Sequence, residues 1–584
     1  MLKRLAGCIR EYKTASILSP LIVMLEVVLE CIIPFLTAEL VREIQGNCNM
    51  NVLLRYGLIL LVMAVLSLTC GALAGHFCAT ASCGFGKNLR KDLFYNVQRF
   101  SFGNIDKFST SSLVTRLTTD VANVQMAYMM LVRTAFRAPF MMIFSFIMAF
   151  YMGGKMAWVF VVVIPILGFG LLLIARKAMP IFRKVFHKYD NLNNSVQENI
   201  QGMRVVKAYV REEREAEKFA AASEEVAADF TRAEKLLALN NPLMQLCLNI
   251  VMLVVIYFGS QLVVSSNQEA LEIGQLSSLL TYGMQILMSL MMLSMIFVML
   301  TMSAESARRI VEVLDEGSMI TNPPAPLYEV KDGSLDFEGV SFKYSEKAEQ
   351  YALQEIDLHI PSGQTVGIIG GTGSSKTTLI QLISRLYDVT EGSVKVGGMD
   401  VREYDLDTLR NQVAVVLQKN VLFSGTIKEN LRWGNLEATD EELVHACKLA
   451  CAHEFITQFP DGYDTHIEQG GTNVSGGQKQ RLCIARALLK KPKVLILDDS
   501  TSAVDTHTDA MIRKAFREEI PGTTKLIIAQ RISSVEDADQ IIVMNGGRID
   551  DMGTHTELLA RNAIYQEVYT SQNKGGAEDG QKNG

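Results

Sequence analysis

A glycine-rich stretch that contains a lysine and three threonines lies in the second half of this 584-residue chain. A strand-like apolar segment, residues 365–369, precedes it, and an apolar helical segment, residues 379–386, follows it. In such a loop the backbone N–H groups approach phosphate oxygens, the lysine reaches the outer phosphates, and a threonine hydroxyl can ligate Mg²⁺. The pattern therefore predicts a phosphate-binding loop made of Gly370, Gly371, Thr372, Gly373, Ser374, Ser375, Lys376, Thr377 and Thr378.

Two downstream segments carry groups that a bound nucleotide needs. The run from Val494 to Asp498 reads as a buried strand that ends in a carboxylate, where a nucleotide-bound Mg²⁺ would be held. The segment Ser475, Gly476, Gly477, Gln478 opens a predicted helix and presents a hydroxyl and backbone amides to an anion. Ser375 stands where the usual loop pattern has its second glycine, so the loop alone would also fit an ordinary turn. These two companions favour the phosphate-binding interpretation.

The first half of the chain is much more apolar than the second. Hydrophobic residues make up 49% of the sequence and charged residues 20%, a balance that indicates a membrane portion. A helix needs roughly 20 apolar residues to cross a bilayer. Six apolar runs are near or above that length, so six spans are predicted, at about 17–40, 53–75, 134–153, 156–175, 243–264 and 273–302.

Basic residues in the connecting segments predict the orientation of these spans. Segments 84–133 and 176–236 are long and rich in lysine and arginine, whereas segment 265–275 has neither. The long segments, which read as helical, should be cytoplasmic, and both termini should then lie inside. Before the first span, Leu2, Leu5 and Ile9 recur at helical spacing, which predicts a helix on the membrane surface.

The composition changes after Met302. A proline-rich linker at 322–326 precedes short Val, Ile and Leu strands that alternate with helical stretches, the pattern of an α/β domain. The predicted fold is an all-α membrane domain of six helices followed by an α/β phosphate-loop domain. The predicted boundaries are a transmembrane domain at 1–314, a linker at 315–329, a nucleotide-binding domain at 330–573 and a disordered tail at 574–584.

Charge and cysteine usage exclude other classes of protein. A formal net charge of −6 argues against a nucleic-acid binder, and six spans argue against a soluble ATPase that acts on nucleic acid. The 10 cysteines form no CxxC pair. The nearest metal-like group is His445, Cys447, Cys451 and His453, which lies in a helical stretch, so we interpret the thiols as structural.

Taken together, these motifs resemble those of the ATP-binding cassette (ABC) transporters. The likeness is to half-transporters of the multidrug and lipid exporter type, with six helices followed by one nucleotide-binding domain, and it extends over nearly the whole chain. It implies ATP and Mg²⁺ as cofactors, ATP hydrolysis coupled to transport, a second half-transporter as partner, and a multi-pass location in the cell or inner membrane.

The resemblance also assigns roles to single residues. It implies that Tyr344 stacks on adenine and that Gln418 senses the γ-phosphate and Mg²⁺, which Thr377 and Asp498 would also hold. Asp505 resembles the loop that crosses the dimer interface. Two cytoplasmic segments, Ile105 to Asp120 and Asn199 to Glu217, resemble those that bear coupling helices. Without the resemblance, Tyr344 would be read as an ordinary strand aromatic.

Three positions depart from the family pattern, and all belong to one nucleotide site. Asp499 replaces the glutamate that orients the attacking water, and Gln530 replaces the switch histidine at the γ-phosphate. Ser375 is the third departure. Aspartate is one methylene shorter, and glutamine cannot become cationic. We therefore expect the degenerate-site subunit of a heterodimer, in which Ser475 to Gln478 complete the competent site of the partner.

The transported compound is less well defined by the sequence. A face of methionines on the sixth span suits varied hydrophobic or amphipathic ligands, but packing against neighbouring helices is the more ordinary explanation (Met284, Met288, Met291, Met292, Met295, Met299 and Met302). Glu26 and Glu30 are expected to pair with Arg133 or Arg137, or to attract a cationic substrate. A lipid exporter, a peptide exporter and an ATP-gated protein that does not pump remain alternatives.

Overall fold

The computed structural model describes residues 1–584 except 47–48, 267, 269–270, 346–347, 501 and 580–584. Side chains are also not described at 183, 186–187, 190–191, 194 and 573–579. The chain forms two compact units, one made of Met1–Arg99 and Ser109–Glu316 and the other of Phe100–Phe108 and Gly317–Gly584. The short segment Phe100–Phe108 therefore belongs with the C-terminal unit, although it lies far from it in sequence.

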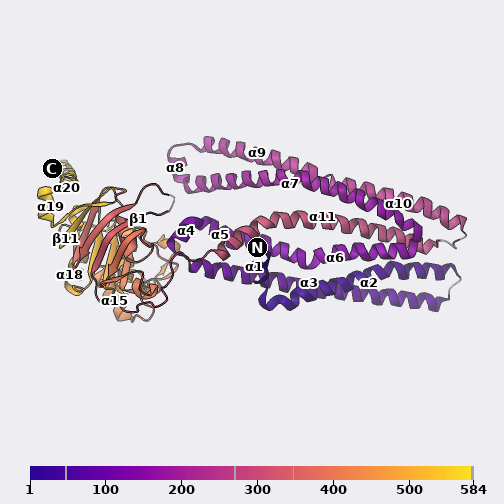
Figure 1. Ribbon diagram of the computed structural model, residues 1–584, viewed down its shortest axis with the longest axis horizontal. Coiled ribbons are helices and arrows are strands. Elements are labelled where there is room, and N and C mark those ends of the chain that lie inside the picture. Colours follow the sequence, from indigo (N-terminus) through magenta and orange to yellow (C-terminus); the bar gives the residue numbers. More distant parts are fainter. Residues whose placement is uncertain (47–48, 267, 269–270, 346–347, 501, 580–584) are drawn as a thin grey trace. The chain divides into compact units, whose positions relative to one another are not determined.

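The N-terminal unit is a bundle of long helices (Figure 1). Seven of its helices have 26 or more residues, and six of these carry the predicted apolar runs: α2 (Lys13–Gln45), α3 (Met50–Gln98), α6 (Val121–Gly153), α7 (Trp158–Gln201), α10 (Asn240–Ser265) and α11 (Ile273–Asp315). The other elements join these six helices. The short ones are α1 (Leu2–Ala6), the 3₁₀ turns η1 (Arg10–Tyr12) and η3 (Gly154–Ala157), α5 (Thr110–Thr115), a π-helical turn η2 (Arg116–Asp120) and α8 (Met203–Ala208). The long one is the 26-residue α9 (Glu212–Leu237), which follows α8.

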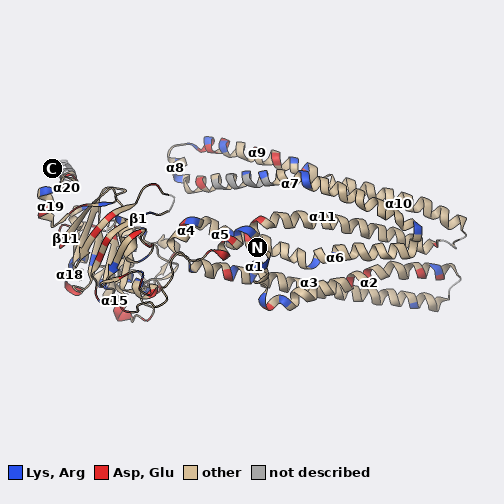
Figure 2. Cartoon of the chain, viewed as in Figure 1, with Lys and Arg blue, Asp and Glu red and all other residues tan. Residues whose placement is uncertain are grey.

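Five helical stretches among the described residues are long and apolar enough to cross a membrane. They are Arg10–Gln45, Met50–Gln98, Thr110–Phe182, Glu212–Ser265 and Ile273–Asp315. The predicted number was six, and the difference lies in Thr110–Phe182, which contains α6 and the first part of α7 with only the short turn η3 between them. Figure 2 shows the middle parts of α10 and α11 almost free of charged residues.

Polar contacts inside this bundle satisfy groups that lipid could not. Two hydroxyls of α11 donate to backbone carbonyls of α2, Tyr282 to Cys31 at 2.8 Å and Ser278 to Pro34 at 2.6 Å. Such bonds are expected near a proline inside a transmembrane helix, where the helical hydrogen-bond pattern is interrupted. They hold α11 against α2 at mid-span.

Glu26 and Glu30 of α2 both form ion pairs with one arginine of α6. Arg137 donates to Glu26 at 2.5 Å and to Glu30 at 2.8 Å. Arg133 forms no ion pair among the described residues, so the pairing that the sequence left open between two arginines is made by Arg137. The two arginines lie one helical turn apart on the same face, which is why spacing could not distinguish them.

Three sheets build the C-terminal unit. The first, of four strands in the order β2-β1-β4-β5, comprises β1 (Leu335–Phe342), β2 (Leu353–Ile360), β4 (Glu391–Val396) and β5 (Met399–Asp400). The second, in the order β12-β11-β3-β10-β9-β6, comprises β3 (Thr365–Gly370), β6 (Val413–Val416), β9 (Val494–Asp498), β10 (Thr524–Ile528), β11 (Gln540–Asn545) and β12 (Arg548–Gly553). A two-stranded pair, β7 (Gly425–Thr426) and β8 (His466–Ile467), completes them.

The helices of this unit are short and lie between the strands in sequence. They are α4 (Phe102–Phe108), α12 (Lys376–Ile383), α13 (Leu406–Gln412), α14 (Ile427–Arg432), α15 (Asp440–Leu449), α16 (His453–Thr457), α17 (Gly476–Leu488), α18 (Thr506–Glu519), α19 (His555–Arg561) and α20 (Ala563–Asp579), with 3₁₀ turns at Gly462–Asp464, Gln469–Gly471 and Ile532–Ser534. The predicted disordered tail overlaps the end of α20, and its last part, 580–584, lies outside the described residues.

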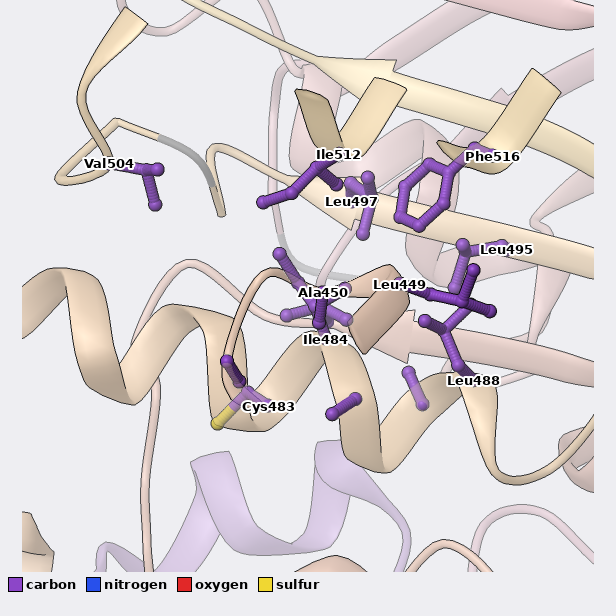
Figure 3. Packing of buried hydrophobic residues seen from close by; sticks show 14 of the residues in the cluster. Leu449, Ala450, Cys483, Ile484, Leu488, Leu495, Leu497, Val504, Ile512 and Phe516 are labelled. Carbon is purple, nitrogen blue, oxygen red and sulfur yellow. The ribbon is translucent and has the colours of Figure 1, made fainter. Parts of the chain in front are cut away.

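Two apolar cores fix the second sheet. In one of them, Ile484 and Leu488 of α17 pack toward Leu495 and Leu497 of β9, and Phe516 of α18 joins them (Figure 3). All five residues of β9 are buried, as expected for a central strand covered on both faces. The helix that begins in the segment Ser475–Gln478, called SGGQ after its residues, is thereby packed against the strand that carries Asp498.

Candidate functional site

Parallel pairing of four strands brings the predicted site residues to one edge of the second sheet. Strands β3, β10, β9 and β6 are neighbours in that order and run parallel. The glycine-rich loop follows β3, Gln530 follows β10, Asp498 ends β9, and Gln418 follows β6. Because parallel strands place their carboxyl ends at the same edge, residues more than 100 positions apart meet there.

The lysine of the loop is folded back onto the loop itself. Lys376 Nζ donates to the carbonyls of Gly370 at 2.8 Å and Gly371 at 2.9 Å, and lies 3.3 Å from Ser374 Oγ. Burial lowers the pKa of Lys376, although Asp498 and Asp499 oppose this effect. The loop thus encloses an ammonium group that is held by neutral carbonyls and lies close to two carboxylates.

Ser375 adopts the conformation that a glycine would take at this position. Its φ is +70° and its ψ 25°, in the left-handed region, where a Cβ carries a steric cost. Gly373 also has a positive φ, of +83°. The departure from the usual pattern therefore leaves the backbone path of the loop intact and adds local strain and one hydroxyl group.

Thr377 and Asp498 present adjacent oxygen atoms. Thr377 Oγ1 donates to both carboxylate oxygens of Asp498, at 3.0 and 3.2 Å. Asp498 is only 2% exposed, and burial raises its pKa, with the neighbouring Asp499 acting in the same direction. A hydroxyl and a poorly compensated carboxylate side by side suit Mg²⁺, which prefers oxygen ligands and would neutralise the buried charge. These residues therefore fit the cation that accompanies a bound nucleotide.

Asp499 is held by the two glutamines of the neighbouring strands. Gln530 Nε2 donates to Asp499 Oδ2 at 2.9 Å, and Gln418 Nε2 reaches the same oxygen at 3.4 Å. Burial raises the pKa of Asp499, while both glutamines act to lower it. The three predicted catalytic residues, Asp499, Gln530 and Gln418, thus form one cluster in which a single carboxylate oxygen accepts both amides.

Tyr344 lies beside the loop helix, at the end of the first sheet. Its hydroxyl is 2.8 Å from Thr378 Oγ1, and its side chain is still 53% exposed. Its ring meets the ring of Tyr387 edge-on, with centroids 5.3 Å apart. An exposed aromatic ring that is tied to the phosphate loop by its hydroxyl can accept a planar base.

Tyr387 was not identified from the sequence, yet it joins two parts of this unit. Its hydroxyl donates to Asp106 Oδ2 of α4 at 2.7 Å, and its ring contacts Phe102 at 6.1 Å between centroids. Burial, followed by the bond to Asp106, raises the pKa of Tyr387. One side chain thus contacts both Tyr344 and the segment that resembles a coupling helix. An isolated tyrosine at the end of a helix carries no sequence signal for such a role.

The SGGQ segment forms a helix N-terminus, as predicted. Ser475 is the N-cap of α17, where its Oγ accepts from the N–H of Gln478 at 3.3 Å, and the Gln478 side chain accepts from the N–H of Ser475 at 2.9 Å. Gly477 has no room for a Cβ, which would come within 2.8 Å of the Ala503 carbonyl oxygen. Asp505 caps α18 in the same way, accepting from the N–H of Thr508 at 2.9 Å.

The SGGQ group and the phosphate loop are separate within one chain. No hydrogen bond between described residues joins Ser475 or Gln478 to the loop that contains Lys376. Their connection is indirect, through the buried Gln480, which accepts from the N–H of Ala503 at 3.1 Å and bonds Ser502 at 3.4 Å. Ser502 in turn donates to the carbonyl of Asp499 at 2.9 Å. Gln480 is a second residue that sequence reasoning missed.

The histidines and cysteines between residues 445 and 453 do not form a metal site in the part of the chain that the structure describes. No group of three or more His, Cys, Asp or Glu side chains suited to a metal ion occurs among the described residues, including the stretch from His445 to His453. Cys447 is buried, and desolvation raises its pKa to about 12, so it stays a thiol at neutral pH. Cys447 belongs to the apolar core that also contains residues of α17.

Family models cover both parts of the chain. Residues 16–290 match the ABC transporter transmembrane region, and residues 353–502 match the ABC transporter domain. The ABC transporter ATP-binding protein YfiB of Bacillus subtilis (strain 168) is 34% identical over 97% of this chain and 97% of its own length. The mitochondrial potassium channel ATP-binding subunit of Rattus norvegicus is 34% identical over 83% of this chain and 68% of its own.

A solved structure shares the fold. A bacterial Atm1-family ABC exporter with ATP bound superimposes with a TM-score of 0.84 at 24% identity, over 96% of this chain and 99% of that one. This likeness concerns the arrangement of helices and strands in each chain.

Proposed function

Because the chain belongs to the ABC transporter family as an exporter half-transporter, we propose that it is the subunit of a heterodimeric exporter that supplies the degenerate nucleotide site. Its helical region makes it an integral membrane protein with a cytoplasmic nucleotide-binding domain. ATP binding follows from the same membership. The further step is that this chain supplies the nucleotide site with the weaker hydrolytic groups and its partner supplies the competent one.

The observation that carries the proposal is the state of Asp499. In place of glutamate, a carboxylate one methylene shorter has one of its oxygens engaged by the amides of Gln418 and Gln530. A base must come within roughly 2.6–3.2 Å of the water that it orients, and losing one methylene withdraws it by roughly 1 Å or more. By contrast, the binding groups Lys376, Thr377 and Asp498 are all present. The chain would therefore bind ATP well and hydrolyse it slowly.

A second half-transporter is needed because the two halves of a site lie apart in this chain. Ser475 to Gln478 form an intact helix N-terminus that would close over the nucleotide of the partner. Tyr344, Lys376 and Asp498 would hold ATP at the degenerate site, which the partner's corresponding segment would close. ATP hydrolysis at the partner's composite site would then drive alternating access.

Measurement of ATPase activity with and without a partner tests this proposal. The purified full chain should hydrolyse ATP slowly, and co-purification with a half-transporter that carries the usual glutamate and histidine should restore brisk hydrolysis. Asp499→Asn in this chain should leave most of the activity of the pair. Brisk hydrolysis by the chain alone, abolished by Asp499→Asn, would refute the proposal.

We propose six crossings rather than five, with both termini inside. As one helix, the 73 residues of Thr110–Phe182 would be about 110 Å long at 1.5 Å per residue, far more than the roughly 30 Å of a bilayer core. Gly154, at φ +50°, breaks the helix between α6 and α7. Lys155→Cys should therefore react with a membrane-impermeant maleimide from outside intact cells, and labelling only in inside-out vesicles would contradict this.

The methionine face of α11 supports a hydrophobic or amphipathic substrate. Met288 and Met295 are 61% and 60% exposed, so other helices of this chain do not cover them. This favours contact with a substrate over packing within the chain. Leucine at Met288, Met292 and Met295 should change substrate preference more than basal ATPase activity. Equal changes in both would indicate packing against the partner.

ATP-dependent gating without pumping is the second candidate. One relative is an ATP-binding subunit of a potassium channel, and the weak base described above would suffice for a protein that only binds ATP. Transport that persists with a non-hydrolysable ATP analogue would favour gating, whereas strict dependence on hydrolysis by the partner would favour the exporter.

A further inference from the structure

A cavity of about 560 Å³ lies in the N-terminal unit, where α1, the C-terminal part of α3 and the end of α11 meet. Its wall carries four cationic side chains, Arg4, Arg10, Lys91 and Arg99, and one carboxylate, Asp92. It is separate from the nucleotide site, whose residues all belong to the other unit.

Two of the four cations are already paired, and two are not. Arg10 donates to both oxygens of Asp92 at 2.8 Å, and Arg4 lies 3.1 Å from Asp315 at the end of α11. Lys91 stands 5.5 Å from the centroid of the Tyr95 ring, and neither Lys91 nor Arg99 has a carboxylate within ion-pair distance among the described residues. With Asp315 included, the wall keeps a formal charge of +2.

The carbonyl groups that could offset this charge are occupied. The C-terminal end of α11 points its carbonyls into this region, but Arg4 donates to Leu314 O at 2.9 Å, and Asn96 donates to Val313 O at 2.7 Å and to Glu316 O at 3.0 Å. The partial negative charge of the helix end is therefore neutralised within the protein. Lys91 and Arg99 are left to an external anion.

The backbone around the cavity is held in a fixed and strained form. Arg10 has a φ of +42°, a conformation that is strained for a non-glycine residue and persists only where surrounding contacts impose it. The bond to Asp92 and the bond from Asn88 Nδ2 to the Cys8 carbonyl at 3.0 Å supply those contacts. The guanidinium of Arg10 thus forms a fixed wall.

The cavity is on the cytoplasmic side of the membrane. Its wall includes Leu314, three residues before Gly317, where the main segment of the unit with the cytoplasmic nucleotide-binding domain starts. Beside it, Leu2 of α1 is 77% exposed, as expected of a helix with an apolar side toward the bilayer surface. Basic pockets in such juxtamembrane positions bind phosphate head groups.

We propose that this cavity binds a phosphate group, with Lys91 and Arg99 as its primary ligands and Arg10 as a fixed wall. The excess charge of +2 matches a phosphate that carries one or two negative charges. The phosphate belongs either to an acidic phospholipid of the inner leaflet or to a soluble compound. Through Arg4 and Asn96, an occupant would rest against the end of α11.

Two charge-removing variants of the full chain test the proposal. Lys91→Gln with Arg99→Gln removes the two unpaired cations. The matched control is Lys13→Gln with Lys87→Gln, which removes two exposed lysines of α2 and α3 outside the cavity wall and so lowers the general field equally. Unchanged thermal unfolding midpoints would establish that all proteins are folded.

Binding is measured in two arms. The lipid arm compares retention of phosphatidylglycerol and phosphatidylcholine in nanodiscs. The soluble arm measures inorganic phosphate by equilibrium dialysis, in a Lys376→Ala background so that the nucleotide loop does not contribute. In the arm that corresponds to the ligand, the variant of Lys91 and Arg99 should bind about thirtyfold more weakly than the unchanged chain. This loss corresponds to two cations at about 1 kcal/mol each. The control should bind almost as well as the unchanged chain.

Each result decides the question. A selective loss in the lipid arm assigns the site to a phospholipid, and a selective loss in the soluble arm assigns it to a free phosphate compound. No binding in either arm, or equal losses in the variant and its control, would overturn the proposal. The outcome is independent of ATP hydrolysis, so it does not depend on the degenerate-site hypothesis.

Discussion

At the scale of single residues, the nucleotide site combines intact binding groups with a poorly compensated pair of carboxylates. Asp498 and Asp499 are adjacent, and burial raises the pKa of both. Thr377 and the two glutamines donate to them, but no cation forms an ion pair with either among the described residues. An unliganded site of this kind destabilises the fold in the absence of nucleotide and Mg²⁺.

This cost leads to a prediction with a defined pH dependence. A carboxyl group whose pKa is higher in the folded state begins to cost stability as the pH rises above its unfolded pKa, and the cost is complete once the pH exceeds its folded pKa. Asp498→Asn should therefore raise the thermal midpoint of the nucleotide-free protein at neutral pH by roughly 2–4 °C, the shift that about 1 kcal/mol produces in a domain of this size. The gain should shrink as the pH falls toward the unfolded value near 3.8.

Thermal unfolding of the full chain without nucleotide, at neutral and acidic pH, measures this effect. Asp461→Asn, an exposed change in the same domain, is the control and should leave the midpoint unchanged at both pH values. Addition of Mg²⁺ and ATP should stabilise the unchanged chain more than the Asp498 variant. A lower midpoint for Asp498→Asn at neutral pH would show that the carboxylate stabilises the unliganded fold.

At the scale of helices, an ion pair joins Glu26 and Glu30 of α2 to Arg137 of α6 inside the bundle. Glu26 is 6% exposed, and its Oε2 has no hydrogen-bond partner, so its charge depends on Arg137 through Oε1. Removing one partner of a buried pair commonly costs about 3–5 kcal/mol, because it leaves a buried charge without compensation. Removing both partners costs less.

A double-mutant cycle tests this link. Arg137→Gln should be strongly destabilising, and adding Glu26→Gln should recover part of the loss. Arg133→Gln is the matched control, because it lies one turn away and has no ion pair among the described residues. Unfolding of the detergent-solubilised full chain gives the free energies, and additive losses for Glu26 and Arg137 would show that the pair is not coupled.

The order of elements was predictable from sequence, whereas their contacts were not. Hydropathy located the apolar parts of α2, α3, α6, α7, α10 and α11, and the alternation of apolar runs located β3 and β9 with the residues that follow them. The sequence could not choose between Arg133 and Arg137, and it gave no sign that Tyr387 would contact both Asp106 and Tyr344. Such contacts depend on packing between distant segments, which local periodicity does not encode. The left-handed backbone of Ser375 is not indicated by serine itself, although the loop pattern, which has a glycine at this position, is consistent with it.

At the scale of the whole molecule, two of the three departures from the family pattern, Asp499 and Gln530, stand where hydrolysis would be affected, while the groups expected to hold ATP and Mg²⁺ remain. Lys376, Thr377 and Asp498 keep their contacts, and Gln480 and Ser502 connect the backbone of Asp499 to the helix that begins at Ser475. Each chain of a heterodimer would contribute this helix to the other's site. The state of one site can then reach the other through a short path of hydrogen bonds.

The last prediction follows from this asymmetry. In the assembled pair during turnover, the site that contains Lys376 should retain labelled nucleotide much longer than the partner's site, so that the two domains stay partly joined between cycles. Asp499→Glu with Gln530→His should speed nucleotide loss from this site without a proportional gain in transport, because transport is driven from the other side. Replacing the partner's catalytic glutamate should stop transport almost completely. Equal exchange rates at the two sites would contradict the asymmetric scheme, since a site that releases nucleotide as fast as its neighbour cannot keep the domains joined.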